Sequence, residues 1–251
     1  MRLTEYEIES IYKVFKEVFD NGRIYLFGSR VDNTLKGGDI DLYIQTTYNK
    51  DLFQKKINFL TKVKECIGEQ KIDVVFEGDG SKMIEIEAKE KGVEMNVNKL
   101  KLEKYFHECD KHLQRINEAY EELKTFIPIT AKEYEELSKE QVQSIDQYLF
   151  RFSKLQDTLG DKVFKLLVSL YEESFFQKTF IDILNTLEKI GYLYSAKEWI
   201  NLRQIRNNIS HQYDDEPELM SQAINEIVNN KTVIEKIYTS VKMKYNEVLS
   251  V

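Results

Sequence analysis

The sequence predicts an α+β N-terminal domain with a small mixed sheet, followed by an all-α helical bundle. Helical and strand-like patterns alternate up to about residue 95, and only helical periodicity follows from about residue 99. The chain has 251 residues and a hydrophobic content of 42%, which is enough to build a substantial core. We therefore expect a first domain over residues 1–96 and a second domain over residues 99–251.

The first domain is expected to alternate helices with short buried strands. Apolar spacing predicts, in order, a helix over 8–19, strands over 23–27 and 39–44, a helix over 53–67 and a strand over 71–76. Ser81 is expected to cap a short last helix that ends near Gly92.

The second domain has the pattern of a helical bundle. Apolar residues at three- and four-residue steps predict helices over 102–123, 142–159, 180–190 and 199–209, and a last helix from Pro217 through Ile237. We expect Pro128 and Gly160 to interrupt this half. Since amphipathic helices of this kind must bury their apolar faces, they are expected to pack on one another.

Composition excludes several classes of protein. No run approaches the roughly 18 apolar residues that cross a bilayer, and the N-terminus lacks the apolar stretch of a secretion signal. A cytoplasmic protein without a membrane partner is expected. Cys66 and Cys109 are expected to be buried free thiols, and three histidines make a zinc site a poor interpretation. The net charge of −7 comes without a basic tail, so an RNA substrate would need a local site.

Carboxylates gather on two of the predicted strands. Asp39 and Asp41 are two residues apart, so their side chains project from one face while the residues between and after them face the core. Asp73 on the following strand is the natural third acid. Like charges on one face are costly unless a cation lies between them, and hard oxygen ligands favour magnesium. In an acidic protein, Asp-x-Asp alone is more often a solvated pair.

Glycines flank these acids. Gly28, Ser29 and Arg30 follow the first predicted strand, where backbone N–H groups, a hydroxyl and a positive charge can approach a triphosphate. Gly37 and Gly38 directly precede Asp39 and permit close approach of the backbone.

The complete pattern over residues 1 to about 95 resembles the MNT (minimal nucleotidyltransferase) branch of the DNA polymerase β-like nucleotidyltransferases, and more distantly kanamycin nucleotidyltransferase. The resemblance implies that ATP is the substrate and that Gly28 and Ser29 hold its phosphates. It also implies that Asp39, Asp41 and Asp73 hold Mg²⁺. Asp73 would in addition assist deprotonation of the attacking hydroxyl.

A second motif lies on the helix around residue 205. A polar stripe is expected opposite an apolar one; the polar residues are Arg203, Arg206, Asn207, Ser210 and His211, and the apolar ones are Trp199, Leu202, Ile205 and Ile209. On periodicity alone, this is a solvated helix face with a structural histidine. The string from Arg206 to His211, however, matches the Arg-x4-His signature of HEPN domains, including the asparagine after the arginine. Residues 99–251 resemble that family, and the string 151–157 supports the resemblance.

The resemblance implies a metal-independent ribonuclease with RNA as substrate, whose composite site forms in a homodimer. His211 would exchange a proton with the RNA 2′-hydroxyl or the leaving group, and Arg206 would donate to the phosphorane. On an ideal helix these two residues diverge by about 140°. A local bend or a second subunit must therefore bring them together.

Tyr213 completes the string Arg-x4-His-x-Tyr. In HEPN toxins paired with MNT antitoxins, this tyrosine accepts AMP and the ribonuclease is silenced, so the resemblance implies a fused toxin–antitoxin or defence protein. Tyr213 is otherwise one of 15 tyrosines. An alternative is a nucleotidyltransferase acting on a small molecule, with the helical half as a substrate-binding lid. A further alternative is a scaffold that binds no metal.

Overall fold

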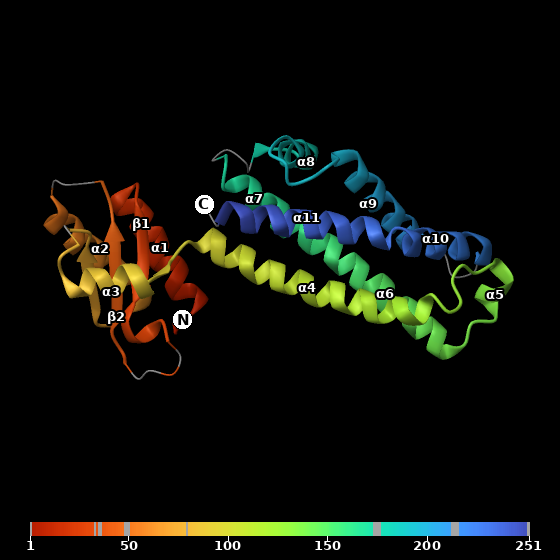
Figure 1. The fold of residues 1–251 in the computed structure, drawn as a ribbon, viewed down its shortest axis with the longest axis horizontal. Helices are drawn as coiled ribbons and strands as arrows, with labels where there is room; N and C mark the ends of the chain where they lie inside the picture. The colour runs from red at the N-terminus through yellow and green to blue at the C-terminus, as the bar shows by residue number, and fades with distance from the viewer. Residues whose placement is uncertain are drawn as a thin grey trace. The chain divides into compact units, whose positions relative to one another are not determined.

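The computed structural model describes residues 2–32, 34, 37–47, 51–78, 80–172, 177–211 and 216–249, with backbone only at 210, 211 and 249. The chain divides into two compact units, Met1–Leu100 and Lys101–Val251. The first is a mixed sheet with helices and the second is helical, which confirms the predicted fold class (Figure 1). Among the described residues, no helix has the length and apolar character needed to cross a membrane.

A four-stranded sheet organises the first unit in the order β3-β2-β1-β4. Strands β1 (Arg23–Phe27) and β2 (Ile40–Gln45) are antiparallel, whereas β2 and β3 (Ile72–Phe76) are parallel. The two-residue strand β4 (Val93–Glu94) pairs antiparallel with β1. The first three strands were predicted, but β4 is too short to show an alternating pattern.

Helices cover both faces of this sheet. Helices α1 (Glu5–Phe19) and α2 (Leu52–Ile67) bury an apolar core on one face, and α3 (Met83–Lys91) packs on the other through Ala88. Gly92 ends α3 as expected. The prediction that Ser81 caps α3 was wrong, because Lys82 is the N-cap residue and makes no side-chain capping hydrogen bond.

Long helices shape the second unit, and α4, α6 and α11 run lengthwise through it in Figure 1. In chain order the helical segments are α4 (Val97–Leu123), α5 (Ala131–Glu135), α6 (Lys139–Asp157), the π-helical segment η2 (Thr158–Phe164), α7 (Lys165–Ser169), α8 (Phe180–Lys189), α9 (Ala196–His211), α10 (Pro217–Asn229) and α11 (Lys231–Leu249). They share one continuous apolar core. A hydroxyl–carboxylate contact of 2.5 Å from Tyr238 to Asp110 joins α11 to α4 within it.

Two predictions for this unit were wrong, and so was the prediction for Cys66 in the first unit. Gly160 does not interrupt the helix, because it lies inside η2 and packs under Trp199; a Cβ there would be 3.1 Å from Cζ2 of that ring. The last predicted helix is two, since α10 ends at Asn229 and α11 begins at Lys231. Cys66 is exposed, whereas Cys109 is buried as expected, and burial raises the pKa of its thiol to about 12.

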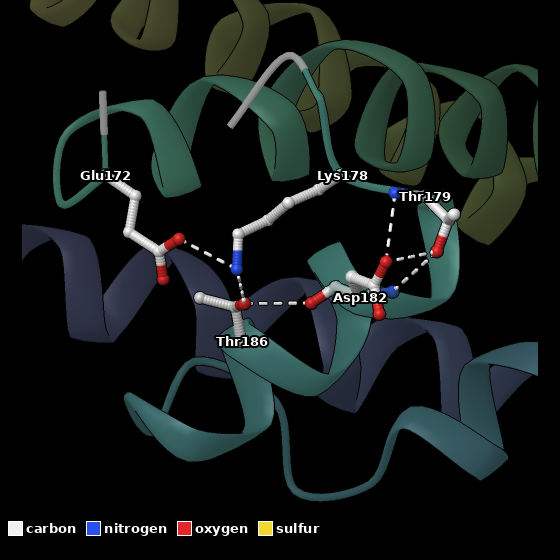
Figure 2. Close-up of polar contacts among 5 residues, drawn as sticks. All are labelled: Glu172, Lys178, Thr179, Asp182 and Thr186. Carbon is white, nitrogen blue, oxygen red and sulfur yellow. Dashed lines mark hydrogen bonds and ion pairs between the residues drawn. The ribbon is translucent and has the colours of Figure 1, made fainter. Parts of the chain in front are cut away.

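A polar cluster fixes the start of α8 (Figure 2). The hydroxyl of Thr179 accepts a hydrogen bond from the backbone of Asp182, whose carboxylate accepts one in return, so a capping box begins the helix. The Lys178 ammonium lies between the Glu172 carboxylate at 2.7 Å and the Thr186 hydroxyl at 3.0 Å. These contacts tie the segment before α8 to the body of that helix.

Asn225 on α10 clamps the connection between α4 and α5. Its amide accepts a hydrogen bond from the backbone N–H of Ile129 at 2.9 Å and donates one to the carbonyl of the same residue at 2.8 Å. We expect Asn225→Ala to lower the free energy of unfolding by about 1–3 kcal/mol, because it leaves two backbone groups of a buried residue without partners. Urea unfolding measures the change. Gln222→Ala, on the exposed face of the same helix, is the control; an equal loss there would contradict this account.

Candidate active site

The acids of the first unit come together on the sheet face that α3 covers. Asp41 in β2 and Asp73 in β3 are register partners across the parallel pair, and Asp39 directly precedes β2. Ile40, which lies between Asp39 and Asp41, and Leu42, which follows Asp41, are buried in the core on the opposite face. Alternation along the strand thus places these carboxylates as the sequence predicted.

The turn η1 (Gly28–Arg30) lies directly against Asp41. Gly28 has a φ of +70°, and a Cβ on it would be 2.4 Å from Oδ2 of Asp41. A Cβ on Gly37 would likewise be 2.1 Å from Oγ of Ser29. Both glycines therefore allow backbone to approach polar side chains of the predicted site more closely than any other residue would.

Arg30 stabilises this turn through hydrogen bonds of its side chain. Its guanidinium donates to the carbonyl of Gly38 at 2.5 Å and to Oε1 of Gln70 at 3.1 Å. The Arg2 side chain donates to the carbonyl of Ser29 at 2.7 Å. Arg30 thus links η1 to the segment that leads into Asp39, a contact that the sequence did not reveal. Its predicted role in holding phosphate stays a prediction.

Lys71 is a member of the site that the sequence analysis missed. Its ammonium lies 2.5 Å from Oδ2 of Asp39 and 3.8 Å from Oδ2 of Asp73. The missed signal was its two-residue spacing from Asp73, because Lys71 directly precedes β3 and alternation along the extended chain places both side chains on one face. Lys71 supplies the positive charge that two exposed neighbouring carboxylates favour.

The pKa of Asp41 reflects the acids that lie close to it. Burial raises the pKa of its carboxyl, and the negative charges of Asp73 and Asp39 raise it further, while Lys71 acts in the opposite direction. When neighbouring groups disfavour the ionised form of a carboxyl group, a bound cation stabilises that ionised form most strongly. In the described part of the chain, no three His, Cys, Asp or Glu side chains lie as close together as metal ligands do. The carboxylates have the oxygen donors that Mg²⁺ prefers. In this structure, the Lys71 ammonium contacts the carboxylates of Asp39 and Asp73.

The titration of Asp41 offers a test of this arrangement. We expect Asp73→Asn to lower the pKa of Asp41 and Lys71→Met to raise it, because the first removes a repelling charge and the second an attracting one. Carboxyl NMR of the metal-free protein measures both shifts, and Lys64→Met is the control because its ammonium pairs with Glu69 instead. Shifts of the same sign would contradict the arrangement.

The same raised pKa sets a pH dependence of stability. Since the pKa of Asp41 is higher in the folded state, ionisation of this group opposes folding. Its contribution to the free energy of unfolding therefore falls as pH rises from the ordinary aspartate range through the folded-state pKa.

The second motif lies on α9. The Arg206 guanidinium donates to Oε1 of Gln156 at 3.1 Å and to the carboxylate of Asp157 at 2.8 Å, both on α6. Asn207 is half-buried. His211 is the last residue of α9, but its side chain lies outside what the structure describes, as does the whole of Tyr213. The proposed roles of the last two residues therefore stay predictions.

Trp199 belongs to the core, as its place on the predicted apolar stripe of α9 requires, but its ring also borders arginines of the polar stripe. Trp199, Arg203 and Arg206 line one small cavity together with residues of α6, η2 and α8. Positions separated by four and seven residues share one face of a helix, so the indole lies with the arginines. Leu202 and Ile205 contribute to the same core.

Residues 8–95 match the family model described as a nucleotidyltransferase domain. No match was found among curated proteins or among solved structures. The matched range contains Gly28, Ser29 and the three carboxylates, and it ends before the helical unit. The match supports nucleotidyl transfer as the general activity of the first unit and a nucleotide as its substrate.

Proposed function

We propose that residues 1–96 form an MNT-type domain that transfers AMP from ATP to Tyr213 of a HEPN-type domain over residues 99–251. The placement of Asp41 beside Asp73 and against Gly28, inside the matched range, supports the transferase part of the proposal. The Arg-x4-His-x-Tyr string supports the choice of acceptor.

The transfer reaction needs a nucleophile and groups that neutralise the negative charge of the phosphates. The phenolic oxygen of Tyr213 would attack the α-phosphorus of ATP, forming a new P–O bond while the bond between the α-phosphorus and the bridging oxygen breaks and pyrophosphate leaves. Asp73 would accept the phenolic proton. Asp39, Asp41 and Asp73 would hold Mg²⁺, which neutralises phosphate charge when bound. Gly28 and Ser29 would present N–H groups and a hydroxyl to the phosphates.

The helical unit would act as a ribonuclease when Tyr213 is unmodified. Arg206 would donate to the phosphate under attack by the RNA 2′-hydroxyl, and His211 would exchange the proton, with Asn207 beside them. A composite site in a homodimer would bring these groups together. The nucleotidyl group on Tyr213 would add negative charge near Arg206 and compete with RNA for it. The whole chain would then be a self-regulating toxin–antitoxin or defence protein.

Intact mass after incubation with ATP and Mg²⁺ tests the acceptor. We expect an increase of one or more AMP units that maps to the Tyr213 peptide and is absent in Tyr213→Phe. An increase that persists in Tyr213→Phe would contradict this acceptor. ATP consumption that requires an added small molecule would instead support a transferase whose helical half is a lid.

RNA cleavage by the full chain tests the second activity. Asp39→Asn/Asp41→Asn should remove self-modification and so increase cleavage and growth inhibition. Adding His211→Ala or Arg206→Ala to that double variant should abolish both effects. Growth inhibition that survives these changes would contradict a HEPN-type ribonuclease.

A further inference from the structure

A small cavity in the helical unit carries chemistry that the proposed roles of Arg206 and His211 do not use. It lies between α6, η2, the start of α8 and α9, and has a volume of about 20 Å³. Because a single water needs roughly 10–15 Å³, the cavity accepts one oxygen-sized group at its base. Its walls include Gln156, Trp199, Arg203 and Arg206.

Two buried groups on these walls have no hydrogen-bond partner among the described residues. They are Nε2 of Gln156 and Nε1 of Trp199, whose residues are 2% and 1% exposed. Arg206 donates a hydrogen bond to Oε1 of Gln156, and this contact sets the orientation of the amide. The other amide atom, Nε2, is therefore the one without a partner among the described residues. Both unpartnered groups are N–H donors and neither can accept. Their missing partner must therefore be an acceptor.

The surrounding charges favour an anionic acceptor over a neutral one. Arg203 and Arg206 both line the cavity, and Arg203 also lies 5.1 Å from the centre of the Phe180 ring. Of the two acids on the walls, Asp157 is paired with Arg206 and Asp161 with Lys165. The acidic acceptors are thus engaged, while the two neutral donors have no partner in the described parts of the chain.

Resting on the proposed ribonuclease, we propose that this cavity binds a non-bridging phosphodiester oxygen of RNA through Gln156, Trp199 and Arg203. Arg206 contacts the same phosphate from the rim. The ion pair between Arg206 and Asp157 competes with the phosphate, because both acceptors use the same guanidinium. Gly160 preserves the cavity wall, since a Cβ there would press on the Trp199 ring.

Trp199 is the only tryptophan of the chain and therefore reports on the cavity directly. The test is a titration of the full-length protein with dimethyl phosphate at constant ionic strength, followed by tryptophan fluorescence. We expect a saturable change in the wild type. Arg203→Met should weaken binding about tenfold, since it removes a charged donor. Arg115→Met, which removes an exposed arginine of α4, should leave binding unchanged.

Asp157→Asn gives a result that unfolding cannot mimic. It removes the competing charge while keeping the shape of the side chain, so dimethyl phosphate should bind severalfold more tightly. A response that matches sodium chloride alone, or an Asp157→Asn variant that binds more weakly, would show that the cavity holds water only and would overturn the proposal.

RNA whose riboses are 2′-O-methylated cannot be cleaved through the 2′-hydroxyl and identifies the source of the phosphate. It should displace dimethyl phosphate from the wild type, and failure to displace it would overturn the assignment to RNA. Cleavage of ordinary RNA is measured separately. Cleavage without any phosphate response would contradict the phosphate site in this cavity but agree with the proposed ribonuclease. Phosphate and RNA binding without cleavage would contradict the proposed ribonuclease but agree with the phosphate site.

Discussion

Asp41→Asn is expected to reduce nucleotidyl transfer by at least about 10²–10³-fold. Metal-assisted stabilisation of transition-state charge contributes several kcal/mol, and each 1.4 kcal/mol changes the rate tenfold. Asparagine keeps the size of the side chain but removes the charge that would hold the cation. Asp41 is the most enclosed of the three acids and the one whose pKa burial raises. Intact mass after incubation with ATP and Mg²⁺ measures the loss.

The stability of this variant separates a chemical effect from unfolding. Burial and two neighbouring acids disfavour the charged form of Asp41, so the neutral asparagine should leave the melting temperature unchanged or raise it. Asp32→Asn makes the same chemical change at an exposed acid after η1 and should retain transfer. Full transfer by Asp41→Asn would show that this carboxylate has no role in the reaction.

Gly28→Ala is expected to lower transfer by about 10²-fold, the cost of misplacing a catalytic group by about 1 Å. Its added methyl would lie 2.4 Å from Oδ2 of Asp41, so the carboxylate or the turn η1 must move. The substitution also places a side chain at φ +70°, which costs about 1–2 kcal/mol of stability. Transfer and urea unfolding are measured on the same preparation.

Two other glycines separate these effects. Gly68 has φ +83°, and its Cβ position has no neighbour within 4 Å in the described parts of the chain, so Gly68→Ala should lose stability and keep transfer. At Gly38, no described residue lies within 4 Å of the Cβ position and φ is not positive, so Gly38→Ala should change neither strongly. If Gly68→Ala lowered transfer as much as Gly28→Ala, general destabilisation would explain the effect and contact with Asp41 would not.

Local patterns in the sequence determined the main elements of the fold. Short apolar runs predicted β1, β2 and β3. Alternation with a period of two also placed Asp39 and Asp41 on one face, because side chains of a strand alternate regardless of what packs on them. Helical spacing predicted most helices of the second unit for the same reason. Such signals need several residues, so the two-residue strand β4 and the short helix α5 were missed.

Only the tertiary structure decided which distant groups meet. Arg206 contacts Gln156 and Asp157, about fifty positions earlier in the chain, and nothing in the α9 string specifies that contact. Gly160 has the residue type of a helix break, yet packing under Trp199 keeps it helical. Propensity is a preference of about 1 kcal/mol per residue, which burial of a large ring exceeds. The sequence by itself therefore determined the elements and the motif residues, and the packing of those elements decided the partners of Asp39, Asp41 and Arg206.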